Sequence, residues 1–404
     1  MSEKSQSRRR ALEGLVVLDL TRLLPGAFCS QILADLGAEV IKIEIPDGGD
    51  YNRSWEPKAK VESGSFLLLN RNKKSLTLNL KNPAAKQVFL RLAATADVVL
   101  EGFRPGVMER LGLSYEALRK DNPGLVYCAI SGYGQDGPMR LAVGHDLNYM
   151  AIAGALQLFG QPGQGPMVPG LSIADVGGGS LMATTGILAA LRSRDQTGEG
   201  QFVDISMTDG TVSWLSLHGA DYLFADIEPK GGERPFIGQA PCYATYLCAD
   251  GRYVALGAIE EHFWERFCQI CSVPPELQTH YPEGEEAERQ RAFIARVMLA
   301  RDRDEWVALA EEADIPLSPV NSMEEAFRHP QLAHRKMLQE IDHPVEGRIP
   351  QLGFPIKLSE TPCDMRAPPP LLGQHNEAVL TAAGYSQAEI RALREEGAIS
   401  CKRL

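Results

Sequence analysis

Short apolar runs alternate with longer segments of mixed polarity over the first half of the chain. Short apolar runs bounded by turn residues are typical of buried strands, whereas the longer segments suit helices. The pattern predicts strands at 15–20, 39–44, 75–80, 97–101, 125–130 and 201–206, and helices at 25–36, 83–94, from Pro105, 152–158, 180–191 and 209–224. Because strands that alternate with helices form parallel sheets, we expect an α/β fold.

A polar stretch at 225–235 interrupts this pattern and reads as a linker. Beyond it, two short strands at 243–248 and 253–257 precede a charged, helical segment, which suits a smaller α+β domain. The predicted organisation is a disordered leader at 1–11, a large α/β domain at 12–224, a linker at 225–240, the small domain at 241–330 and a Pro-rich C-terminal strap with helices at 331–404. Ser386 and Glu389 form a capping box for the last of these helices.

The charge composition excludes some classes of binding partner. The 404 residues include 41 basic and 52 acidic side chains, for a net charge of −11. This balance argues against a nucleic acid or an anionic membrane as partner, so local basic residues must hold any anionic ligand. The eight cysteines are scattered, several of them within apolar runs, as buried thiols in a reducing compartment would be. With no signal peptide or membrane span visible, we expect a cytoplasmic protein.

Two sequence motifs suggest cofactors that their context excludes. The loop 132–137 is a literal G-x-G-x-x-G, but Pro138 follows it and no acidic residue lies about twenty positions beyond, so a nicotinamide or flavin site is not expected. Cys268 and Cys271 form a C-x-x-C inside a predicted helix without a second pair of ligands, so we expect no zinc site. No cofactor is therefore predicted.

Candidate chemistry concentrates between Gly144 and Ser180. His145 follows a glycine, and Asp175 precedes three glycines, where backbone could approach a ligand closely. Taken singly, a histidine of this kind is more often a packing residue, and an aspartate before glycines is more often a turn or cap residue. Basic residues lie in a predicted flexible loop at 70–74 and after the strand that ends at Glu101. Since ligands bind beyond the carboxyl ends of parallel strands, Arg104 is placed to meet a phosphate.

Several segments together resemble the class III CoA-transferase family, including its α-methylacyl-CoA racemase branch. They are Leu-Val-Val-Leu-Asp-Leu-Thr-Arg from Leu15, Ala-Glu-Val-Ile-Lys-Ile-Glu from Ala38, Leu-Asn-Arg-Asn-Lys-Lys-Ser from Leu69, Gly-Phe-Arg-Pro-Gly from Gly102, Ser-Gly-Tyr-Gly-Gln-Asp-Gly-Pro from Ser131 and Gly-Glu-Gly-Gln from Gly198. The resemblance covers about residues 12–395. It implies a Rossmann-like large domain built from both chain ends, a smaller domain between them and an interlocked homodimer.

Two chemistries diverge within the family. In its transferases, the residue that matches Asp175 is a carboxylate nucleophile that carries the acyl group. In the racemase branch the motif reads Gly-His-Asp-Ile-Asn-Tyr, which the chain matches at 144–149 with Leu in place of Ile, and the residues matching His145 and Asp175 are the two acid/base groups. Glu260 falls in a segment similar to the branch's Gly-x-Ile-Glu-Pro, which implies that it orients His145. Without the resemblance, Glu260 reads as a helix cap or first-turn acid.

The resemblance therefore favours racemisation at the α-carbon of a 2-methyl-branched acyl-CoA. Two acid/base groups would flank one carbon, and the thioester enolate would need fixed donors, for which we expect backbone N–H groups at 175–178. The alternatives are a CoA-transferase with Asp175 as nucleophile and a CoA-ester-binding protein without catalysis. CoA enters as part of the substrate.

The resemblance also implies the contacts with CoA. On the nucleotide side they are Leu78, Asn79, Leu80, Lys81, Gly102, Phe103, Arg104 and Arg110, and on the thioester side they are Gly144, Asp146, Asn148 and Tyr149. One departure stands out, because the chain has Ile45 where many members have an arginine for the adenosine phosphate. The contact with the adenosine phosphate is therefore either lost or made by Lys73 or by Arg71 in the same loop.

Overall fold

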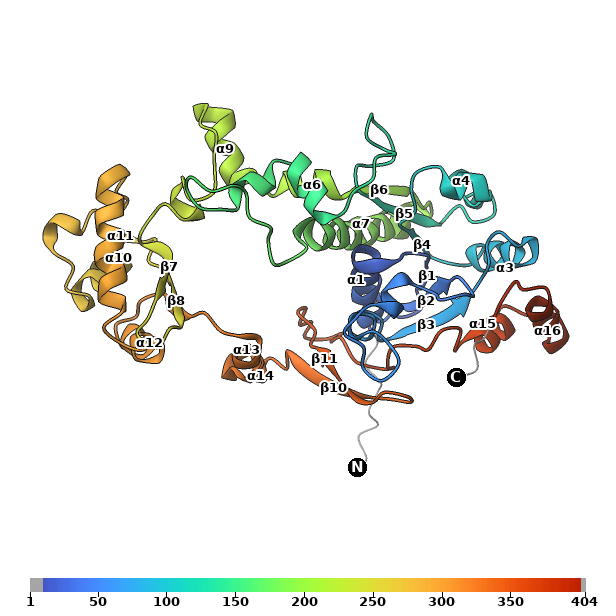
Figure 1. Ribbon diagram of the computed structural model, residues 1–404. Helices are drawn as coiled ribbons and strands as arrows, with labels where there is room; N and C mark the ends of the chain where they lie inside the picture. Colours follow the sequence, from blue (N-terminus) through green and yellow to red (C-terminus); the bar gives the residue numbers. More distant parts are fainter. Residues whose placement is uncertain (1–9, 401–404) are drawn as a thin grey trace. The chain divides into compact units, whose positions relative to one another are not determined.

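The computed structural model describes residues 10–400, which form two compact units (Figure 1). The first unit contains the described chain up to Ala153, then Leu171–Ser213 and the chain from Pro330 onward. The second unit contains Gly154–Gly170 and Trp214–His329. Residues 1–9 of the predicted leader lie outside the described residues. Arg10 pairs with Asp364, with 3.0 Å between Nε and Oδ2.

A six-stranded parallel sheet forms the centre of the first unit, which confirms the predicted α/β fold. Its spatial order is β3 (Lys73–Thr77), β2 (Glu39–Glu44), β1 (Val16–Asp19), β4 (Val98–Glu101), β5 (Val126–Ser131) and β6 (Phe202–Ser206). In the register, Leu18 of β1 lies between Ile41 of β2 and Val99 of β4. The strand order reverses between β1 and β4, and open α/β sheets bind ligands at such a switch point.

Helices cover both faces of this sheet (Figure 1). Apolar side chains of α3 (Pro83–Ala93), α15 (Asn376–Ala382) and α16 (Gln387–Glu395) pack with sheet residues such as Leu18 and Leu76 in one core. The opposite face carries α1 (Leu23–Asp35) and α7 (Met182–Thr197), which contact each other. The predicted capping box is present, since Ser386 Oγ accepts a hydrogen bond from Glu389 N and the Glu389 carboxylate accepts one from Ser386 N.

Shorter elements complete the first unit. They are the 3₁₀ turn η1 (Tyr51–Ser54), α2 (Gly64–Leu69), α4 (Val107–Leu111), α5 (Tyr115–Leu118), α6 (Asp146–Ile152), the π-helical segment η3 (Ala174–Leu181), α8 (Met207–Ser213), α14 (Pro330–His334) and the antiparallel pair β10 (Leu338–His343) and β11 (Gly347–Leu352). The helical run Ala174–Thr197 is long and apolar enough to cross a membrane, but 56% of its most apolar stretch is buried in the protein. Core helices of soluble proteins meet the same criterion.

The second unit has its own sheet and core. Its antiparallel strands lie in the order β7 (Tyr243–Leu247), β8 (Tyr253–Gly257) and β9 (Leu317–Pro319). Its helices are α9 (Ser216–Ala225), α10 (Glu261–Ile270), α11 (Gly284–Met298), α12 (Arg303–Glu312) and α13 (Met323–Arg328), with 3₁₀ turns at Ala155–Leu158, Pro235–Ile237 and Pro275–Leu277. Cys268 and Cys271 are buried in this core beside Trp264 and Phe267.

The prediction of a flexible polar loop at 70–74 is wrong. Arg71 is buried and forms an ion pair with Asp35, with 2.6 Å between Nη2 and Oδ2. Lys73 already belongs to β3 and is fully buried, where its ammonium donates to Ala27 O and Asn70 Oδ1, both at 2.9 Å. These buried polar partners hold the segment 70–74 in place. Its polar composition had led us to expect a solvated loop.

Two predicted helices are also interrupted. The segment 209–224 divides into α8 and α9, which belong to different units. The segment 152–158 is not one helix, because α6 ends at Ile152 and Gly154 adopts a φ of 81° before a 3₁₀ turn begins. Apolar composition alone does not reveal where such a run breaks.

Candidate active site

The structure brings His145 and Asp175 into one region of the first unit. His145 is the exposed N-cap residue of α6, and Asp175 lies at the start of the π-helical segment η3. Asp146, next to His145, accepts a hydrogen bond on Oδ1 from Asp175 N at 2.9 Å. This bond joins the two segments that carry the predicted acid/base pair.

Hydrogen bonds within α6 fix the backbone around His145. Asn148 Oδ1 accepts a hydrogen bond from His145 N at 3.0 Å, and the Tyr149 hydroxyl donates to Gly144 O. The Tyr149 ring also lies edge-on to Tyr133, with 5.3 Å between centroids. A Cβ on Gly132 would lie 2.3 Å from the Tyr149 ring, so the first glycine of the G-x-G-x-x-G loop makes room for this tyrosine.

The environment of Asp175 changes its acidity. Burial, and then the negative charge of Asp146, raise the pKa of the Asp175 carboxyl to about 7. Among the described residues, none donates a hydrogen bond to this carboxylate, so nothing offsets the loss of hydration. A carboxyl with this pKa exists in both protonation states near neutral pH, which suits general acid/base chemistry. π-Helical segments are rare and are frequently found at functional sites.

The glycines that follow Asp175 do not form the expected ligand-facing loop. Gly177, Gly178 and Gly179 lie inside η3 and are buried. A Cβ on Gly178 would lie 2.4 Å from the backbone oxygen of Met207, so this glycine allows α8 to pack closely. The predicted enolate donors at 175–178 are also partly wrong, because Asp175 N donates to Asp146 and Val176 N donates to Ser172 O at 3.1 Å.

A cavity of about 500 Å³, which we call the His145 cavity, joins two predicted segments. Gly102, Phe103 and Arg104 line it from the turn after β4, and Gly144, His145, Asn148 and Tyr149 line it from the loop and first turn of α6. The turn after β4 is fixed by Glu101, whose carboxylate accepts the N–H of Phe103 at 2.6 Å. Burial raises the pKa of Glu101 to about 8.

A second cavity of about 530 Å³, the switch-point groove, lies beyond the carboxyl ends of β1, β2 and β3. The predicted nucleotide-side residues Leu78–Lys81 line it, as does Phe103, which also lines the His145 cavity. Arg110 lines an adjoining groove of about 490 Å³ together with Leu80 and Lys81. The predicted CoA contacts therefore follow the carboxyl edge of the sheet.

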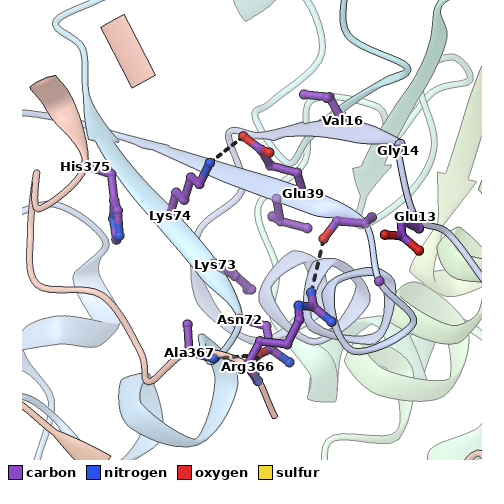
Figure 2. Close-up of a pocket in the computed structure, with 13 residues that line it drawn as sticks. Glu13, Gly14, Val16, Glu39, Asn72, Lys73, Lys74, Arg366, Ala367 and His375 are labelled. Carbon is purple, nitrogen blue, oxygen red and sulfur yellow. Dashed lines mark hydrogen bonds and ion pairs between the residues drawn. The ribbon is translucent and has the colours of Figure 1, made fainter. Parts of the chain in front are cut away.

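Lys73 does not reach this edge. Lys73 begins β3 and is one of the residues that line a different cavity of about 370 Å³, together with Glu13, Glu39 and Lys74 (Figure 2). Burial lowers the pKa of Lys73 to about 7. The buried side chains of Lys73 and Arg71 are engaged with neighbouring protein groups, so neither replaces the arginine that is absent at Ile45.

Glu260 belongs to the second unit, where it is the N-cap residue of α10. The position is the one that the cap interpretation predicted, but the Glu260 side chain forms no capping hydrogen bond. Two arginines missed by the sequence reasoning line the site, with Arg22 in the switch-point groove and Arg140 in the His145 cavity. The signal for Arg22 was its position just beyond the carboxyl end of the first strand.

Comparisons with known proteins identify the family to which the chain is similar. The family model "CoA-transferase family III" matches residues 12–376. The chain is 35% identical over 397 residues to a succinyl-CoA:glutarate CoA-transferase of Mus musculus, with 96% of this chain and 90% of that protein covered. It is 34% identical over 394 residues to an alpha-methylacyl-CoA racemase of Homo sapiens, with 98% and 99% covered.

A solved structure shares the fold as well. The crystal structure of a CAIB/BAIF family protein from Brucella suis superposes with a TM-score of 0.81 and 29% identity, and the match covers 93% of this chain and 100% of that one. These matches confirm the family resemblance seen in the sequence. The chain therefore belongs to CoA-transferase family III, an enzyme superfamily whose matched members include both transferases and racemases.

Proposed function

We propose that the protein racemises the α-carbon of a 2-methyl-branched acyl-CoA by proton transfer through His145 and Asp175. The observation that carries the proposal is the environment of Asp175, whose pKa is raised to about 7 while its backbone is joined to the residue after His145. A carboxyl that is half protonated near pH 7 suits a group that both gives and takes a proton.

In the proposed reaction the two groups act from opposite faces of the α-carbon. For one enantiomer, neutral His145 removes the α-proton and protonated Asp175 returns one to the other face. For the opposite enantiomer, ionised Asp175 removes the proton and the His145 imidazolium returns it. Each positioned acid or base contributes on the order of 10²- to 10⁴-fold to the rate.

The test is incorporation of deuterium at the α-carbon in D₂O, with a 2-methylacyl-CoA and no acceptor acid. We expect exchange from both enantiomers with the native protein. His145→Gln should abolish exchange from one enantiomer and Asp175→Asn from the other, with the CoA ester still bound. Exchange on both faces by His145→Gln would refute the assignment, and a panel of branched acyl-CoAs would define the acyl group.

Acyl transfer between carboxylic acids is the second candidate, and the match to a succinyl-CoA:glutarate CoA-transferase favours it. Asp175 would then attack the thioester and carry the acyl group. An adduct on Asp175 that forms only with acyl-CoA and is cleaved by hydroxylamine would establish transfer, and the absence of α-proton exchange would exclude racemisation.

We also propose that Glu260 orients His145, that the protein is a homodimer and that it is cytoplasmic. In this scheme a carboxylate holds the imidazole in one tautomer and increases its basicity, and the family dimer allows Glu260 to come from the partner chain. The seven described cysteines are free and six are buried, which supports a reducing compartment. An active monomer in sedimentation experiments would overturn the dimer.

A further inference from the structure

Arg22 places a positive charge in the switch-point groove. It lies three residues beyond the end of β1, at the N-cap of α1, and its side chain lines the groove together with Ile45, Leu80 and Lys81. Among the described residues, no carboxylate forms an ion pair with it. An arginine without an acidic partner in a protein of net charge −11 is available for an anionic ligand.

Aromatic groups hold the Arg22 guanidinium in place. Its carbon Cζ lies 5.0 Å from the ring centroid of Tyr51 and 5.5 Å from that of Phe103, and Nη1 donates to the Tyr51 hydroxyl at 2.8 Å. Because a guanidinium has five N–H donors, this single bond leaves a fork of donors for a phosphate. Phe103 also lines the His145 cavity, so Arg22 contacts a residue that the two cavities share.

The backbone at this turn is held in an unfavourable conformation. Leu23, directly after Arg22, has a φ of 63°, which is rare for a bulky residue. Its N–H donates to the buried Asp50 carboxylate at 3.1 Å, and Asp50 pairs with buried Lys42 at 2.9 Å. Lys42 also donates to Thr21 O at 2.9 Å. Strained backbone positions cluster at functional sites. Here the bond from Leu23 N to Asp50 holds the turn that carries Arg22.

We propose that Arg22 binds a phosphate at the nucleotide end of the acyl-CoA substrate, in place of the arginine absent at Ile45. This inference rests on the proposed function only in that the substrate is a CoA thioester, and it holds for racemisation and transfer alike. Lys81 is a second cation in the groove, and Asp47 is an exposed acid of its lining. The groove therefore has cations from the segments that follow β1 and β3.

The test measures binding of CoA to full-length protein by calorimetry. Charge-assisted hydrogen bonds of this kind predict that Arg22→Ala weakens CoA binding about 10- to 100-fold. Arg22→Lys keeps the charge but loses the fork and should recover part of the affinity. Arg289→Ala, which removes an exposed arginine of α11, is the matched control and should bind CoA like the native protein.

Two further ligands sharpen the result. A loss with CoA but not with 3′-dephospho-CoA would place Arg22 at the 3′-phosphate, whereas an equal loss with both would place it at the pyrophosphate, and either supports the proposal. With the pantetheine thioester as substrate, Arg22→Ala should turn over at the native rate. Native CoA affinity in Arg22→Ala would overturn the role of Arg22 but not the proposed function. The same would follow if Arg22→Ala lost as much activity on the pantetheine thioester as on the CoA thioester. Failure of the native protein to bind CoA would overturn the proposed function itself.

Discussion

Substitution of Asp175 by Asn should stabilise the folded protein in a pH-dependent way. Folding raises the pKa of this carboxyl from 3.8 to about 7, so the folded state disfavours the ionised form. At about 1.4 kcal/mol per pKa unit, the full penalty is about 4 kcal/mol. It is absent well below pH 3.8, grows as the pH rises and is complete above pH 7. Asparagine has the same shape and remains neutral, so it avoids the penalty.

Urea unfolding of the native protein and Asp175→Asn between pH 4 and 8 measures this difference. The free energy of unfolding of the variant should exceed that of the native protein by up to about 4 kcal/mol at pH 8, and the excess should fall below about 1 kcal/mol at pH 4. Asp121→Asn, at an exposed carboxylate, is the control and should show no such trend. An excess for Asp175→Asn that does not change with pH would refute the raised pKa and, with it, the main support for the acid/base role.

Three further substitutions test neighbouring parts of the structure. Asp146→Asn removes the like charge beside Asp175, so the pKa of Asp175 should fall and the pH profile of α-proton exchange should move to lower pH, whereas an unmoved profile would exclude that coupling. Gly178→Ala places a Cβ 2.4 Å from a backbone oxygen of α8, and should cost at least about 2 kcal/mol in the free energy of unfolding; a cost under about 0.5 kcal/mol would contradict the close packing. Arg71→Ala leaves buried Asp35 without its ion-pair partner and should lower the free energy of unfolding by about 3–5 kcal/mol, a loss that Asp35→Asn in the same protein should partly reverse.

The middle of the sheet could be predicted because β1, β4 and β5 are buried on both faces. Such strands are nearly continuous apolar runs, and both ends of β2 fall where the sequence placed them. The position of Arg104 also followed from the rule that ligands bind beyond the carboxyl ends of parallel strands, and the structure places it in the His145 cavity. These predictions depend on local patterns and on connectivity.

Lys73 shows where local patterns fail. Its neighbours in sequence are polar, but its burial depends on oxygen atoms that come from α1 and from the end of α2. Asp19 lies 3.7 Å from its ammonium and adds a further charge from β1. Ala27 and Asp19 lie outside the segment 70–74 and are not visible from it, so the sequence indicated a solvated loop where the fold has a buried strand.

The glycines after Asp175 contribute to the site differently from the way the sequence suggested. We expected a loop that would bring N–H groups to the substrate, but the lack of a side chain at Gly178 instead allows α8 to approach η3. The backbone oxygen of Met207 faces Gly178, and the same residue lines the His145 cavity. A side chain at Gly178 would therefore displace a wall of that cavity as well as weaken the packing. The absence of a side chain at Gly178 therefore affects both the packing of η3, which carries Asp175, and the shape of the His145 cavity.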